Sequence, residues 1–158
     1  MKKVKITTDA SKKELKNREQ FLKIFKNCSI PDNEILVNIG LFLKRQDLTK
    51  VLFFNEIYKK IINIHGIIIE FGCRWGQNLV TLSNLRGIYE PYNRNRKIVG
   101  FDTFQGFPNV NVKDGNAEII EKNAMSCTDN YDEYLKKILD YHEKESPLAH
   151  IKKNFVKI

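Results

Sequence analysis

Two short apolar runs, each ending in an acidic residue and a glycine-containing turn, dominate the stretch from Ile67 to Pro108. The first reads IIIEFGCRWG and the second reads KIVGFDTFQGFP. Consecutive apolar residues without alternation are typical of parallel strands that are covered on both faces. The pattern predicts such strands over Gly66–Phe71 and Lys97–Phe101, with a nucleotide-type cofactor site beyond their carboxyl ends.

Further helices and a third strand are expected around these runs. Leucine spacing predicts a helix over Gln77–Arg86 that stops at Gly87, and Asp129 can cap another helix that ends near Glu145. The segment Lys153–Ile158 has the composition of a third strand. Because crossovers between parallel strands are right-handed, we expect the strand order 3-2-1.

The chain begins with a helical part. A serine–glutamate capping pattern starts a helix over Ser11–Asn27, and apolar spacing predicts another helix over Asp47–Ile62. The predicted fold class is therefore α/β, with an N-terminal helical layer or lid over residues 1–63 and a partial Rossmann-like domain over residues 64–158. The helical layer could pack on the sheet, act as a lid or form an oligomer surface, and the sequence leaves these three roles open.

Charge and composition limit which classes of binding partner, and which cellular location, we expect for this chain. The net charge is +8, and residues 1–26 hold nine basic residues against three acidic ones. A basic segment can bind nucleic acid, but no aromatic-interleaved patch accompanies it, so nucleic acid is disfavoured. No apolar run approaches the ~20 residues that a membrane helix needs, so no membrane association is expected. Three cysteines without a CxxC pair favour a reducing, cytoplasmic location.

The spacing of the glycines discriminates between cofactors. A dinucleotide site would read GxGxxG with an acid about 20 residues further on. Here Gly72 and Gly76 form GxxxG, and Asp102 lies 30 residues after Gly72. The phosphate loop of ATP- and GTP-hydrolysing proteins is absent from the sequence. Nicotinamide and nucleoside triphosphate sites are therefore disfavoured.

The motif from Glu70 to Gly76, ExGxxxG, resembles motif I of class I S-adenosylmethionine-dependent methyltransferases. Together, EFGCRWGQN and GFDTFQGFP resemble the macrocin O-methyltransferase (TylF-like) family, whose members methylate sugar hydroxyls in natural products. The resemblance covers residues 66–108 well and the N-terminal helices loosely. It implies a Rossmann-like methyltransferase sheet, S-adenosylmethionine as cofactor and a sugar or small-metabolite substrate.

The resemblance also implies a cofactor site made from the two turns. Its residues would be Glu70, Gly72, Gly76, Gln77, Asn78, Asp102, Thr103 and Phe104. The first three would shape the loop around the methionine part, and Asp102 would hold the ribose hydroxyls. The two residues after Asp102 would lie beside the ribose and adenine, and the pair at the helix start would touch the amino-acid end. Turn chemistry and helix capping are the alternative roles of these residues.

The chain departs from the family at its end, because the family sheet is larger and this sequence stops in the third strand. The family's acidic metal ligands and catalytic acid or base lie in the later half. Mg²⁺ is therefore implied for complete members, but no ligand and no catalytic residue can be named here. We expect the N-terminal part of a longer enzyme or a truncated gene product.

Two functional hypotheses follow. The first is an O-methyltransferase, or its cofactor-binding part, that acts on a sugar or small-metabolite hydroxyl. The alternative is a non-catalytic remnant that binds cofactor weakly or serves as an interaction module, so enzymatic activity itself is undecided. A third hypothesis, methylation of RNA, is supported only by the basic N-terminus. The acceptor and the oligomeric state stay open, and a homo-oligomer is compatible with both hypotheses.

Several other residues could carry chemistry. Three histidines share no ligand spacing, which indicates surface or packing roles: His65, His142 and His150. Cys73 lies in the first turn without a neighbouring base, so it is interpreted as turn filling. Arg74 and Trp75 could face a substrate or pack on the helical layer. The loop Tyr89–Arg96 could stack on a sugar, and segment 109–129 is long enough to be functional or mobile.

Overall fold

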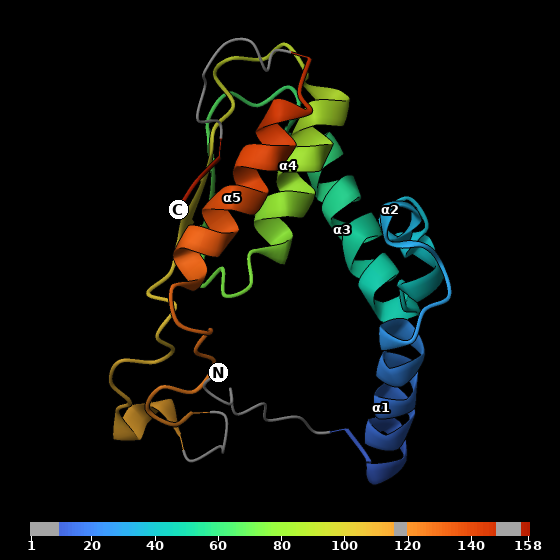
Figure 1. Cartoon of the computed structure of the whole chain (residues 1–158). Coiled ribbons are helices and arrows are strands. Elements are labelled where there is room, and N and C mark those ends of the chain that lie inside the picture. The colour runs from blue at the N-terminus through green and yellow to red at the C-terminus, as the bar shows by residue number, and fades with distance from the viewer. Residues whose placement is uncertain (1–9, 116–119, 148–155) are drawn as a thin grey trace. The chain divides into compact units, whose positions relative to one another are not determined.

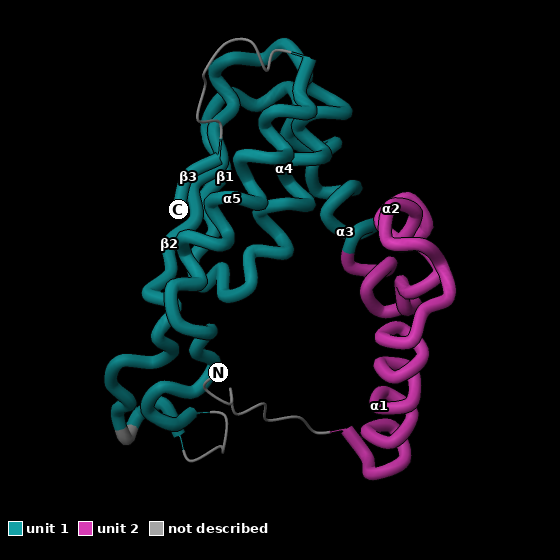
Figure 2. The backbone as a smooth tube through the Cα atoms, in the orientation of Figure 1, with its two compact units in different colours: residues 1–6, 51–158 teal, residues 7–50 magenta. Residues whose placement is uncertain are grey.

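A computed structural model describes residues 10–115, 120–147 and 156–158. The backbone divides into two compact units, one ending at Lys50 and the other beginning at Val51 (Figure 2). Each unit is described by itself. The predicted surface residue His150 and the first part of the predicted strand Lys153–Ile158 lie outside the described residues.

The unit that ends at Lys50 is helical. It contains α1 (Lys12–Lys26), α2 (Asp32–Ile35) and a short 3-10 turn, η1 (Ile39–Phe42). The predicted capping box starts α1: the Ser11 hydroxyl accepts the amide of Glu14 at 3.3 Å, and the Glu14 carboxylate accepts the amide of Ser11 at 2.8 Å. Phe42 packs edge-on against Phe25, with 4.8 Å between the ring centroids. These contacts hold α1 against η1.

The unit that begins at Val51 contains the sheet (Figure 2). Its elements are most of α3 (Arg45–Ile61), β1 (Ile68–Phe71), α4 (Gln77–Tyr89), β2 (Ile98–Phe101), η2 (Val112–Asp114), α5 (Tyr131–Lys144) and β3 (Val156–Lys157). The three strands are parallel in the order β1-β2-β3, with Ile68 opposite Ile98 and Ile98 opposite Val156. The predicted α/β class and strand order are confirmed.

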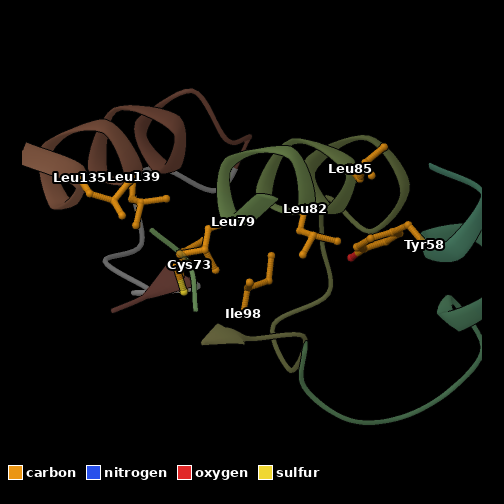
Figure 3. Close-up of a cluster of buried hydrophobic side chains, with 9 residues drawn as sticks. Tyr58, Cys73, Leu79, Leu82, Leu85, Ile98, Leu135 and Leu139 are labelled. Atoms are coloured by element: carbon orange, nitrogen blue, oxygen red, sulfur yellow. The ribbon is translucent and has the colours of Figure 1, made fainter. Parts of the chain in front are cut away.

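Helices α4 and α5 lie side by side and form the core with the sheet (Figures 1 and 3). The buried core residues are Tyr58, Cys73, Leu79, Leu82, Leu85, Ile98, Leu135, Leu139 and Val156. The prediction that both faces of the sheet are covered is wrong for the described residues, because Ile69 and Phe101 are about half exposed and Phe71 is 78% exposed. Phe71 and Phe101 stack on each other instead, with centroids 5.4 Å apart.

Two predicted helix boundaries are also wrong. Helix α4 does not stop at Gly87 but continues to Tyr89, because Arg86 and Tyr89 in its last turns have partners elsewhere in the fold. The cap residue of α5 is Asn130 in a left-handed conformation, not Asp129, and no side-chain hydrogen bond caps this helix. The first error follows from tertiary contacts that local sequence signals do not contain.

A buried polar cluster joins α3, α4 and the start of β2. Glu90 accepts hydrogen bonds from the Tyr58 hydroxyl at 2.6 Å and from Nε of Arg96 at 2.9 Å. The Arg96 guanidinium also donates to the carbonyls of Ile61 at 2.8 Å and Gly66 at 3.0 Å. Burial by itself raises the pKa of Glu90, but these hydrogen bonds outweigh burial and hold that pKa below its ordinary value of 4.5.

Gly76 is required by packing. It has φ +71°, and a Cβ atom there would lie 2.5 Å from Cδ1 of Leu135 on α5. We expect Gly76→Ala to lower the free energy of unfolding by about 1–3 kcal/mol, because the added methyl group would overpack the core and the alanine backbone would be strained at this φ. Urea unfolding measures this, with Gly87→Ala as the control because a Cβ there meets nothing within 4 Å. Equal losses in both variants would contradict the packing assigned to Gly76.

Glu90 gives a pH-dependent prediction. Because its pKa is lower in the folded chain, the stability it supplies is complete above the unfolded value near 4.5 and is lost as pH falls through the folded pKa. Glu90→Gln should lower the free energy of unfolding by about 3–5 kcal/mol at pH 7, since it leaves a buried guanidinium uncompensated. The loss should shrink towards pH 3 in urea unfolding. The role of Glu90 as the partner of Arg96 would be refuted if its substitution lowered the free energy of unfolding equally at pH 7 and pH 3. It would also be refuted if the loss were no greater than that of Glu133→Gln, a change at an exposed residue.

Candidate functional site

Asp102, directly after β2, links the two glycine-containing turns. One carboxylate oxygen accepts the backbone amide of Arg74 at 2.7 Å, and the other accepts the amide of Phe104 at 2.6 Å. The amide of Gly72 donates to the carbonyl of Phe101 at 2.9 Å, so the first turn also continues the strand pairing. The structure thus brings the two predicted motifs together, with Asp102 performing turn chemistry in addition to any contact with a ligand.

The backbone at these turns is strained where Asp102 binds it. Arg74 has φ +48° and Phe104 has φ +57°, both in the left-handed region that non-glycine residues rarely adopt. Gly72 has φ +77°, and a Cβ atom there would meet no heavy atom of the described chain within 4 Å. Gly72 therefore leaves open space beside the first turn, whereas the space beside Gly76 is filled by the side chain of Leu135 on α5.

Glu70 and Asn78 connect the end of β1 to the first turn of α4. The Asn78 side-chain amide donates to Oε1 of Glu70 at 2.6 Å. Its carbonyl oxygen, Oδ1, is buried and accepts no hydrogen bond within the described residues. Gln77 is exposed at the helix start, and the exposed Thr103 hydroxyl donates to the carbonyl of Gly106 at 3.3 Å. All eight predicted site residues therefore lie along the two linked turns.

A cavity of about 700 Å³ lies beside the second turn. Asp102 and Phe104 line it together with Cys127 and Tyr131, while the first-turn glycines and Glu70 do not. The predicted residues are thus divided between an open turn after β1 and a cavity after β2.

Sequence reasoning missed the segment that supports the second turn. The Cys127 amide donates to the carbonyl of Phe104 at 2.9 Å, and the Asn123 amide donates to the carbonyl of Phe107 at 2.9 Å. The cavity is lined by this segment and the residues that follow it, including Ser126, Cys127, Thr128 and Asp129. The end of the long segment 109–129 is therefore part of the site. The length of this segment was the only feature of the sequence that indicated a functional role for it.

Arg74 and Trp75 lie at the first turn, near the start of α5. The Trp75 ring meets Tyr131 edge-on, with centroids 4.8 Å apart, and the Tyr131 hydroxyl donates to the Trp75 carbonyl at 3.0 Å. The Arg74 guanidinium carbon lies 5.5 Å from the centroid of the Trp75 ring. Trp75 therefore packs on α5, which is neither of the two roles that the sequence left open, facing a substrate or packing on the helical layer.

The cysteines of the site are not activated. Burial, followed by the negative charges of Glu70 and Asp102, raises the pKa of Cys73 to about 11. Burial also raises the pKa of Cys127. Both thiols are therefore protonated at neutral pH, which agrees with turn filling and not with a nucleophile.

The remaining candidates do not add to the site. His65 is exposed, and His142 is half-buried on α5, where burial lowers its pKa. In the described parts of the chain, no three histidine, cysteine or acidic side chains are arranged to hold a metal ion. Among the same residues, no helix has the length and apolar composition needed to cross a membrane.

No protein family model matches the chain, and no curated protein matches it. Solved structures do match, and two of them are structures of CalS11. The crystal structure of CalS11, a calicheamicin methyltransferase, is 37% identical with a TM-score of 0.89, and the match covers 96% of this chain and 59% of that one. The chain has an α/β methyltransferase fold. The apo structure of CalS11, described as a TDP-rhamnose 3′-O-methyltransferase of calicheamicin biosynthesis, is 33% identical with a TM-score of 0.75, and the match covers 96% and 56%.

The chain thus spans less than two thirds of the length of either similar structure. The predicted methyltransferase sheet is confirmed at the level of fold. Membership of the macrocin O-methyltransferase family stays a prediction.

Thiol labelling tests the environment of the turn. At pH 7.5 iodoacetamide should modify Cys28 at least about tenfold faster than Cys73 or Cys127, because the latter two are buried and have raised pKa values. Mass spectrometry of the folded chain gives the three rates, and the denatured chain is the control. Equal rates for Cys28 and Cys73 in the folded chain would show that the turn is open or Cys73 activated.

Proposed function

We propose that this chain is an S-adenosylmethionine-dependent O-methyltransferase, or the cofactor-binding part of one, that acts on a sugar hydroxyl. The similarity to CalS11 over 96% of the chain is the observation that carries this proposal. Because the second CalS11 structure is described as a TDP-rhamnose enzyme, a nucleotide-linked sugar is the proposed form of the acceptor. Mg²⁺ is proposed only for the complete fold of the resembled family, because the residues that the structure describes include no group of side chains that could hold a metal ion.

The residues of the two turns fit the proposed cofactor. The open space at Gly72 leaves room for a ligand against the backbone. The buried Oδ1 of Asn78 is an acceptor without a partner in the described chain, and the amino group of the cofactor's methionine part would supply a donor. A carboxylate offers about four acceptor sites, so Asp102 can bind two backbone amides and still accept from ribose hydroxyls.

The cavity beside the second turn fits the adenosine end. Phe104 and Tyr131 supply aromatic surface, with ring centroids 6.1 Å apart, and both residues line the cavity. Asp129 lines the same cavity and could accept a hydrogen bond from the adenine amino group. Thr103 lies beside Asp102 at the rim, where a ribose would sit.

The proposed contribution of this chain is positioning. When bound, S-adenosylmethionine supplies an electrophilic methyl group to the acceptor oxygen. The turns around Gly72 and Asp102 would fix the donor in one orientation, which removes much of the entropic cost of bringing donor and acceptor into line. The rigid hydrogen bonds of Asp102 favour this role, since they hold strained backbone in place before any ligand arrives.

Calorimetric titration with S-adenosylhomocysteine tests the proposed cofactor site. We expect Asp102→Ala and Asn78→Ala to weaken binding by about tenfold or more, since each removes a buried or charged hydrogen-bond partner. Asp140→Asn, an exposed change on α5, is the control and should bind as the unmodified chain does. Failure of the unmodified chain to bind at millimolar ligand would contradict the proposal.

The alternative function is that of a non-catalytic remnant, which would bind the cofactor without transferring its methyl group. Transfer of labelled methyl from S-adenosylmethionine to a TDP-linked sugar separates the two functions. Cofactor binding with transfer supports the enzyme. Cofactor binding without transfer supports the remnant.

A further inference from the structure

Arg74 is a cation in the site that has no anionic side-chain partner among the described residues. Its backbone amide binds Asp102, but its guanidinium makes no ion pair or hydrogen bond with any described residue. The Nε atom of this guanidinium is buried, and the side chain is only partly exposed. A buried guanidinium nitrogen without an acceptor is costly, unless a ligand supplies the acceptor.

The position of this guanidinium is fixed from two sides. Its backbone is held in the left-handed region at φ +48° by the hydrogen bond to Asp102. Its charged end lies 5.5 Å from the Trp75 ring centroid, within the range of a cation–π contact. Trp75 is in turn held by Tyr131 through an edge-on ring contact and a hydrogen bond. The side chain is therefore preorganised.

We propose that Arg74, held against Trp75, is an anion-binding residue that receives the oxyanion of a small-molecule ligand. The planar guanidinium fork matches carboxylate and phosphate oxygens, and its stacking on an aromatic ring leaves donors free for a bidentate contact. Burial and then the negative charge of Asp102 raise the pKa of Cys127, and the positive charge of Arg74 acts in the opposite direction, so the guanidinium lies within electrostatic range of this thiol. Cys127 lines the cavity, so the charge of Arg74 reaches the proposed ligand region.

The inference rests on the proposed function, which supplies two sources of this chemistry. One is the carboxylate at the amino-acid end of the methyl donor, and the other is the diphosphate of a nucleotide-linked acceptor. Arg74 is two residues from Gly72, where the structure leaves open space beside the turn. In this proposal either ligand brings its oxyanion to the guanidinium.

Trp75 allows a direct test, because it is the single tryptophan of the chain and is 38% exposed. Its fluorescence should report ligands that bind at Arg74. The probes are S-adenosylhomocysteine, 5′-methylthioadenosine, which lacks the carboxylate, and thymidine diphosphate. The variants are Arg74→Gln, Arg74→Lys, and Arg74→Gly, which removes the side chain while relieving the left-handed backbone. Arg45→Gln, at an exposed arginine at the start of α3, is the matched control.

We expect Arg74→Gln and Arg74→Gly to weaken one oxyanion-bearing probe by about tenfold or more, and Arg74→Lys to weaken it less. A loss for S-adenosylhomocysteine with unchanged 5′-methylthioadenosine identifies the donor carboxylate. A loss for thymidine diphosphate with unchanged S-adenosylhomocysteine identifies the acceptor phosphate. Both support the proposal.

Unchanged affinity for all probes in folded Arg74→Gln and Arg74→Gly would overturn it, as would equal losses in Arg45→Gln. Failure of the unmodified chain to bind any of the three probes also overturns it. Failure of both adenosine probes alone contradicts the proposed methyl donor, whereas Arg74-dependent binding of thymidine diphosphate would still support the anion site.

Discussion

The carboxylate of Asp102 makes the interaction on which the site depends. Its two oxygens accept backbone amides in the two turns at the carboxyl ends of the strands, from Arg74 after β1 and from Phe104 after β2. Both residues have positive φ, a conformation that costs free energy and therefore needs such a partner. Without these bonds, the open turn at Gly72 and the cavity beside Phe104 would no longer be held at fixed positions relative to each other.

The strands themselves are tied at their other end by Glu90 and Arg96. This buried ion pair, with the Tyr58 hydroxyl, connects the end of α4, the loop before β1 and the start of β2. A buried pair of this kind contributes specificity when all its hydrogen bonds are satisfied, and Arg96 reaches three backbone carbonyls besides Glu90. The sheet is thus fixed at its amino end while its carboxyl end remains available for a ligand.

Local sequence patterns predicted the parts of this fold that local chemistry decides. The apolar runs gave both strands, the capping box gave α1, and the two glycine motifs gave the turns that Asp102 joins. The buried roles of Glu90 and Arg96 could not be predicted, because charged residues in a polar loop resemble solvent-exposed ones. The support from Asn123 to Cys127 could not be predicted either, since it consists of backbone hydrogen bonds that any residues could make.

The central claim is that the turns after β1 and β2 hold one ligand, a methyl donor. Titration of the ¹⁵N-labelled chain with S-adenosylhomocysteine, followed through its backbone amide resonances, tests this claim most directly. The account predicts that the largest shifts occur at Gly72, Cys73 and the segment from Asp102 to Phe104. Shifts confined to residues before Lys50, or no shifts at millimolar ligand, would contradict it.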